Sequence, residues 1–219
     1  MLRLRLPSAL VAAALVAACA PGCSSVKYNA LEKVGIHKRD LLVGNVKDAR
    51  DAQADAQEEF RDALERFGSV VQIRETGLKK AYDRLNGEYE DALAASEEVS
   101  EQIDEVEDVA GDLFDEWSDE NELYTDASLR SSSEATLRDT RARYKELLAT
   151  MKESEASMKP VLATFQNNVL YIKHNLNAQA IGSLQGTFTT LQGDVERLIE
   201  QMNRSIERSN QFIAEMNAA

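Results

Sequence analysis

Apolar residues recur along most of the chain at alternating steps of three and four, a spacing that predicts long helices. The first run has one polar member and consists of Leu42, Val46, Ala49, Gln53, Ala56, Phe60, Ala63, Phe67 and Val70. The second run keeps the same alternation from Leu78 to Trp117. A third extends from Arg141 to Leu176 and includes Leu148 and Glu155, and a shorter fourth extends from Leu184 to Met216. The pattern predicts four helices, at about residues 29–72, 75–123, 132–176 and 178–217.

A strict period of 3.5 residues predicts helices that pack through their apolar stripes, as in coiled coils. We therefore expect an all-α fold, an elongated antiparallel bundle of about four long helices spanning residues 29–219. Segments of about 40 residues rise about 60 Å, so the domain should be a rod. A bundle closed within one chain and a hairpin that pairs with a second copy bury the same stripes, so a homo-oligomer stays open as an alternative.

Turn signals separate the predicted helices. Gly68 and Gly77 bracket the first turn, and the segment from Tyr124 to Ser133, which contains the capping-box sequence Ser-Ser-Ser-Glu at its end, forms the second. Residues 174–177 mark the third turn. Pro160 lies inside the third apolar run, which continues across it, so we expect a kink there and no domain boundary.

The amino terminus has the organisation of an export signal. Arg3 and Arg5 precede an uncharged run from Ser8 to Ala18, and residues 1–18 therefore read as a signal peptide. The apolar run is too short to cross a bilayer of about 30 Å as a helix.

The end of this leader, Val16-Ala17-Ala18-Cys19, resembles the bacterial lipobox, in which the cysteine is acylated. We expect Cys19 to carry thioether-linked diacylglycerol and an N-acyl chain, which are enough for stable anchoring. Residues 19–28 would then be a lipidated tether, and Ala20 after the cysteine favours the outer membrane over the inner one. Cys23, the other cysteine, lacks a preceding aliphatic residue and is expected to be an unpaired thiol, with an intermolecular disulfide as the alternative.

Negative charge is concentrated in one predicted helix. The chain has a net charge of −13, and residues 83–122 contain seventeen acidic residues and one basic residue, Arg84. This balance argues against nucleic acid as a partner. Like charges three or four residues apart destabilise a helix by about 0.2 to 0.5 kcal/mol each. We expect cations at the start of the third helix to offset part of this repulsion, namely Arg138, Arg141, Arg143 and Lys145.

The acidic helix has two interpretations, a solvated face or a surface for a basic partner or divalent ions. The residues that would form such a surface are Asp104, Asp108, Asp112, Asp115, Glu116 and Asp119. A second, polar group near the third turn could contact a ligand, although helix termination and capping explain it as well; it consists of Lys173, His174, Asn175 and Asn177. No calcium-binding loop, Glu-x-x-His pair, phosphate loop or nucleophile elbow is present in the sequence. We therefore expect no enzyme activity, no cofactor and no dedicated metal centre.

Three strings carry a resemblance to a known family: residues 31–40 (LEKVGIHKRD), 106–117 (VEDVAGDLFDEW) and 170–178 (LYIKHNLNA). They resemble the bacterial "domain of unknown function 2959" proteins, and the similarity covers Tyr28 to the C-terminus. The resemblance implies a helical domain, often preceded by a lipoprotein-type signal, with no assigned activity or catalytic residues.

Together these observations predict a lipoprotein on the inner leaflet of the outer membrane, facing the periplasm. Its rod would act as a structural or adapter protein that binds an envelope protein or polymer through its helix faces. The alternative is a module that binds divalent cations or polycations through residues 83–122. An enzyme or enzyme accessory is a third class, which nothing in the sequence favours.

Overall fold

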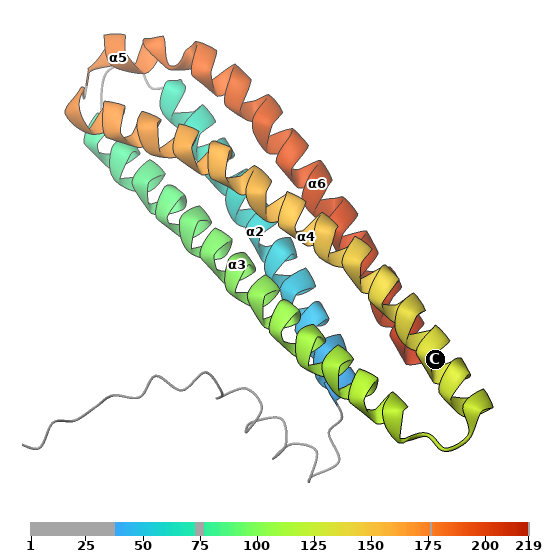
Figure 1. Ribbon diagram of the computed structural model, residues 1–219. Helices are drawn as coiled ribbons and strands as arrows, with labels where there is room; N and C mark the ends of the chain where they lie inside the picture. The colour runs from blue at the N-terminus through green and yellow to red at the C-terminus, as the bar shows by residue number, and fades with distance from the viewer. Residues whose placement is uncertain (1–37, 73–76, 176, 219) are drawn as a thin grey trace, which may run out of the picture.

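The computed structural model describes residues 38–72, 77–175 and 177–218, and this part of the chain is helical without a strand. Its helices are α2 (Lys38–Val71), α3 (Leu78–Leu123), α4 (Ala127–His174), α5 (Ala178–Ser183) and α6 (Gln185–Ala218). The four long helices lie side by side in an elongated antiparallel bundle (Figure 1). The predicted all-α fold is confirmed.

The bundle closes within one chain. Helices α2, α3, α4 and α6 each pack against the next in this order, and α6 packs back against α2. Two hydrogen bonds between side chains join α2 to α6: Arg50 Nη1 donates to Asn210 Oδ1 over 3.0 Å, and Gln57 Nε2 donates to Asn203 Oδ1 over 2.9 Å. The partner numbers fall as the α2 numbers rise, so the two helices are antiparallel.

The molecule is a rod with two distinct ends (Figure 1). Helices α3 and α4 contain 46 and 48 residues, which corresponds to a length of about 70 Å at 1.5 Å per residue. The end that holds Lys38, the α3–α4 turn and Ala218 is called the α3–α4 end, and the opposite end is called the α5 end. None of the described helices combines the length and the apolar content that crossing a bilayer requires.

The apolar stripes form the core. All members of the first predicted run are buried, and the members of the second run are buried or half-buried. Near the α5 end, the Phe67 ring lies 6.4 Å from that of Phe165 and 5.9 Å from that of Phe188, between ring centroids. Each fully buried large apolar side chain stabilises the fold by about 1.5 to 3 kcal/mol. Burial of the stripes is thus the main stabilising contribution.

The register of α4 differs from the predicted run in its first half. Leu147 and Ser154 are fully buried, whereas the predicted core positions Leu148 and Glu155 are only half-buried. Helix α4 packs against both α3 and α6, so its buried face is wider than a single seam. The spacing of apolar residues in the sequence does not show which edge of such a broad face is buried more deeply.

Several core positions are polar. Gln53 of α2, Ser154 of α4 and Ser205 of α6 have no exposed surface, and their side-chain polar atoms have no hydrogen-bond partner among the described residues. Gln53 and Ser205 lie at the same level of the rod, because the two hydrogen bonds between α2 and α6 bracket both. A buried unpaired polar group costs about 1 to 3 kcal/mol, so this level is weaker than the apolar layers.

The helix boundaries correct three predictions. Helix α4 begins at Ala127, not near residue 132, because Asp126 Oδ1 accepts hydrogen bonds from the backbone N–H groups of Ser128 and Leu129 at 2.8 and 3.1 Å. Gly68 lies inside α2, where a Cβ would stand 2.9 Å from Phe188 Cζ. The segment predicted as one helix over 178–217 divides into α5 and α6. The predicted start near residue 29 lies outside the described residues.

Pro160 ends no element. Helix α4 is continuous across it, and Thr164 Oγ1 donates to the Pro160 carbonyl oxygen over 3.0 Å. Pro160 itself is exposed, so its ring points away from the packed face. The prediction that no domain boundary lies there is confirmed.

Two glycines, one just before α3 and one inside it, allow a matched test of the fold. Gly77, just before the helix, has a φ of 86°, where an L side chain costs about 1 to 2 kcal/mol. Gly111 lies in the middle of α3 on its exposed side, and the space that a Cβ would occupy is open. We predict that Gly77→Ala lowers the free energy of unfolding by about 1 kcal/mol. Gly111→Ala should raise it by about 0.5 to 1 kcal/mol, because alanine favours helix. Urea unfolding followed by circular dichroism measures both, and changes of the same sign would contradict the structure.

Candidate functional site

The six carboxylates predicted to form a binding surface all lie on α3 but differ in their surroundings. Asp104 and Glu116 are paired with lysines of other helices. Asp112 is half-buried, and its Oδ2 atom is buried without a hydrogen-bond partner among the described residues. The remaining three are exposed: Asp108, Asp115 and Asp119. The predicted surface is therefore in part an interhelix contact and in part open to solvent.

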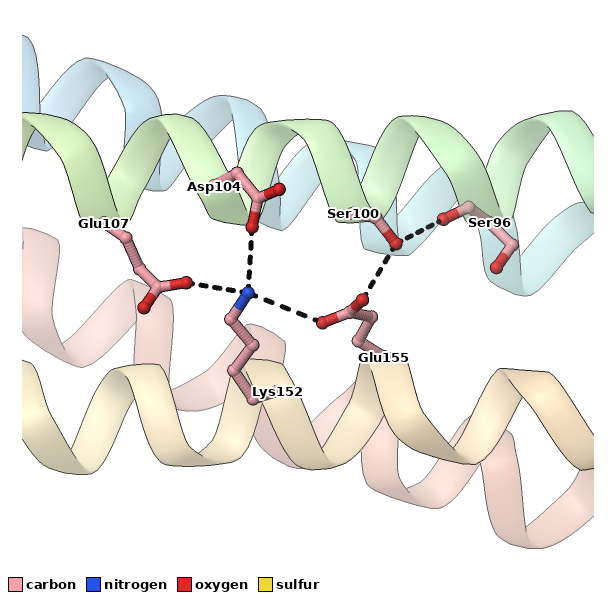
Figure 2. Close-up of polar contacts among 6 residues, drawn as sticks. All are labelled: Ser96, Ser100, Asp104, Glu107, Lys152 and Glu155. Carbon is pink, nitrogen blue, oxygen red and sulfur yellow. Dashed lines mark hydrogen bonds and ion pairs between the residues drawn. The ribbon is translucent and has the colours of Figure 1, made fainter. Parts of the chain in front are cut away.

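Lys152 of α4 is the centre of the main ion-pair cluster (Figure 2). Its Nζ lies 2.7 Å from Glu107 Oε2 and 2.9 Å from Asp104 Oδ1, both on α3, and 3.7 Å from Glu155 Oε2 on its own helix. Ser100 Oγ of α3 extends the cluster, because it lies 3.0 Å from Glu155 Oε1. One ammonium group thus joins the facing sides of α3 and α4.

The cluster holds Lys152 in its charged form. Burial by itself lowers the pKa of this ammonium group, but the hydrogen bonds to Glu107 and Asp104 and the nearby negative charges outweigh it, and the pKa is raised above the ordinary lysine value. The same surroundings act on Tyr144, whose pKa is raised to about 12 by burial and by Glu107. Lys152 therefore keeps its positive charge near neutral pH and acts as a clamp between α3 and α4.

The four cations predicted at the start of the third helix do not form ion pairs with the carboxylates of α3 among the described residues. Lys38 of α2 pairs with Glu116 at 3.1 Å. Arg141 lies beside α3, but it donates to the Phe114 carbonyl oxygen over 2.9 Å and contacts no carboxylate among the described residues. Arg143 faces Glu215 of α6 instead. The remaining two predicted cations, Arg138 and Lys145, form no ion pair within the part of the chain that the structure describes.

Sequence reasoning missed Lys152, because a single lysine in a charged helix carries no pattern of its own. The only local signal was Glu155 three residues later. Its decisive neighbours are distant in sequence and become neighbours only when α3 and α4 pack.

Metal binding receives no support from side-chain grouping. Across residues 38–72, 77–175 and 177–218, no set of three or more His, Cys, Asp or Glu side chains is close enough together to hold an ion. The exposed carboxylates of α3 are spread along the helix, and the inner ones already face lysines.

The polar group near the third turn is used for helix capping. Asn175 Nδ2 donates to the Tyr171 carbonyl oxygen over 2.9 Å, and Asn177 Oδ1 accepts from the backbone N–H of Ala180 over 2.9 Å. Lys173 and His174, in the last turn of α4, are exposed. The two asparagines thus end α4 and begin α5, which agrees with the capping interpretation.

Cys19 and Cys23 lie outside the described residues, and the acylation of Cys19 stays a prediction from the sequence.

Replacement of the central lysine tests the clamp. We predict that Lys152→Gln lowers the free energy of unfolding by about 1 kcal/mol at neutral pH, because Asp104 and Glu107 then repel each other and Glu155. The raised pKa means that this contribution is complete at neutral pH and is lost only as the pH rises through the lysine range. Lys159→Gln, an exposed lysine of the same helix, is the matched control. Equal losses for the two variants in urea unfolding would refute the clamp.

Glu59 of α2 gives a test with pH dependence. Burial, followed by Asp91 and Asp62, raises the pKa of its carboxyl group. A raised pKa favours the fold at acid pH and disfavours it as the pH rises through that pKa. We predict that Glu59→Gln raises the free energy of unfolding by about 0.5 kcal/mol at pH 7 and leaves it unchanged at about pH 3. The exposed neighbour variant Glu58→Gln should show a smaller gain, and a gain for Glu59→Gln that persists at pH 3 would contradict a charge-based cause.

Comparison with known proteins places the chain in one family. A search of curated proteins gave no match. The family model described as "Protein of unknown function (DUF2959)" matches residues 27–216, which covers the bundle and the eleven residues before α2. The chain therefore belongs to the DUF2959 family.

Proposed function

We propose that this protein is a lipoprotein acylated at Cys19, and that its helical rod faces the periplasm as a structural or adapter protein. The observation that carries the proposal is the leader: two arginines, an uncharged run and then Val16-Ala17-Ala18-Cys19. The chain after it has no further cysteine except Cys23, so Cys19 is the best placed acyl acceptor.

The shape of the bundle suits attachment by one end. The chain enters the bundle at Lys38, at the α3–α4 end, and the α5 end lies about 70 Å away. An anchor upstream of Lys38 is thus joined to one end of a rod whose sides stay accessible. A rod held in this way can meet a partner on the facing envelope surface or along its length.

The sides of the rod offer charge more than apolar surface. The large exposed apolar side chains of the described residues lie near the two ends and are Leu123, Tyr124, Leu129, Leu170 and Tyr171. Between the ends, α3 presents exposed carboxylates such as Asp108 and Asp115. A partner that binds this side would need a basic surface, and the association would weaken as salt rises.

The anchor is tested in the native host with matched cysteine variants. We predict that Cys19→Ser abolishes acylation, as measured by mass spectrometry, and moves the protein out of the membrane fraction. Cys23→Ser, which alters the neighbouring cysteine, should keep both the acyl mass and the membrane association. Acylation that survives Cys19→Ser, or that is lost in Cys23→Ser, would refute the assignment.

The adapter role needs a separate experiment, because an anchored protein could lack partners. A photo-crosslinking residue at Asp108 or Asp115 in the anchored chain should give a discrete adduct in intact cells, which mass spectrometry then identifies. The same residue at Glu200, which is exposed on α6, is the control for random collision. Adducts of equal yield at both faces, or none at either, would count against partner binding along α3.

A further inference from the structure

A pocket of about 340 Å³ opens at the α3–α4 end. Its longest wall is α4, where the lining residues extend from Leu129 to Arg143. Leu129 and Arg143 are fourteen positions apart, which corresponds to about 21 Å along the helix, so the pocket is an elongated trough beside α4. Helix α6 forms another wall through Phe212 and Met216, and α2 contributes Arg39.

The outer half of the trough combines large apolar side chains with the small hydroxyl side chains of Ser132, Ser133 and Thr136 on α4. Trp117 of α3 and Tyr124, the residue just after α3, line this half together with Leu129, which is 58% exposed. Trp117 Nε1 donates to Ser133 Oγ over 2.9 Å, so the polar atom of the indole is satisfied and the ring offers its apolar surface. Pockets lined by aromatic and aliphatic groups with a few placed polar atoms are typical of small-molecule sites.

The inner half of the trough is basic. Arg143 lies at its inner limit on α4, beside Glu215 of α6, and Arg39 donates to the Met216 carbonyl oxygen. The distance from Arg143 Nη1 to Glu215 Oε2 is 3.6 Å, longer than a hydrogen bond, so this guanidinium retains donors for another acceptor. Two arginines against one glutamate leave a net positive charge in this half, whereas the adjoining end of α3 is acidic.

The geometry points to a binding site for a single-chain anionic amphiphile, that is, a long-chain carboxylate. Its carboxylate is held by Arg143, with Arg39 beside it, because a guanidinium binds a carboxylate through paired N–H donors. Its aliphatic chain follows α4 across Trp117 towards Leu129 and Tyr124. This site goes beyond the proposed anchoring role and needs no acyl group on Cys19.

The single tryptophan of the chain reports on the trough directly. The experiment uses the full chain with Cys19→Ser, so that no attached acyl chain can enter the trough. Stearate brominated at mid-chain quenches tryptophan on contact and should quench Trp117 with a saturable dependence on concentration. Hexadecane brominated at mid-chain, which lacks the carboxylate, should need at least about tenfold higher concentration, because the charge-assisted hydrogen bonds are missing.

Variants on α4 test the two halves of the trough. Arg143→Gln should weaken the brominated stearate by about tenfold, and Arg138→Gln, an exposed arginine of the same helix outside the trough, should leave it unchanged. Thr136→Phe places a bulky group in the trough from an exposed position and should abolish saturable quenching, with the helical circular dichroism signal retained.

Absence of quenching overturns the site, as does quenching that Thr136→Phe leaves unchanged. Equal affinity for the brominated hydrocarbon overturns the role of the arginines. Stronger quenching by vesicles of mid-chain-brominated phosphatidylcholine than by the carboxylate overturns the single-chain assignment. Because the tested chain has no anchor, these outcomes are independent of whether Cys19 is acylated in the host.

Discussion

Mutual burial of four apolar stripes is the constraint on which this structure depends. A helix with a stripe of period 3.5 gains stability only when neighbours cover that stripe, and α2, α3, α4 and α6 each have two such neighbours. The dependence is greatest for α3, whose residues 83–122 contain seventeen acidic residues and one basic residue. Repulsion along such a helix opposes its formation in isolation. Burial against α2 and α4 offsets that repulsion, and Lys152 and Lys38 add cations from those two neighbours.

The polar positions within the stripes limit how the helices can slide. Gln53 and Ser205 are fully buried at the same level of the rod, between the hydrogen bonds that join α2 to α6. Moving one helix by a heptad would separate these polar groups and place them against apolar side chains. Gln53 and Ser205 have no hydrogen-bond partner among the described residues, so the alignment of α2 with α6 is held by the hydrogen bonds on either side of them. The unpaired polar groups themselves cost stability in the middle of the bundle.

The α3–α4 end brings together the features that bear on function. The chain from the proposed anchor enters the bundle there, the α3–α4 turn leaves apolar side chains exposed there, and the trough with its two arginines opens there. The length of the rod places its other end about 70 Å from the proposed anchor side. Its carboxylate-rich α3 side supplies a charged surface, of which the Lys152 cluster uses the inner part for holding α3 against α4. These features are the basis for the proposed roles in binding and spacing.

The sequence by itself determined the all-α class, the long helices of the described part of the chain and about two thirds of the residues that α2 and α3 bury, because a heptad repeat is a local property that any packing partner must satisfy. It also supplied the only indication of an anchor, at Cys19. Tertiary structure decided which side of α4 lies deepest, with Ser154 fully buried and Glu155 half-buried, because that choice depends on two neighbouring helices at once. It also decided the partners of the charges and the existence of the trough. Lys152 meets Asp104, and Arg143 meets the trough, only when helices distant in sequence are placed side by side, and no local pattern contains that information.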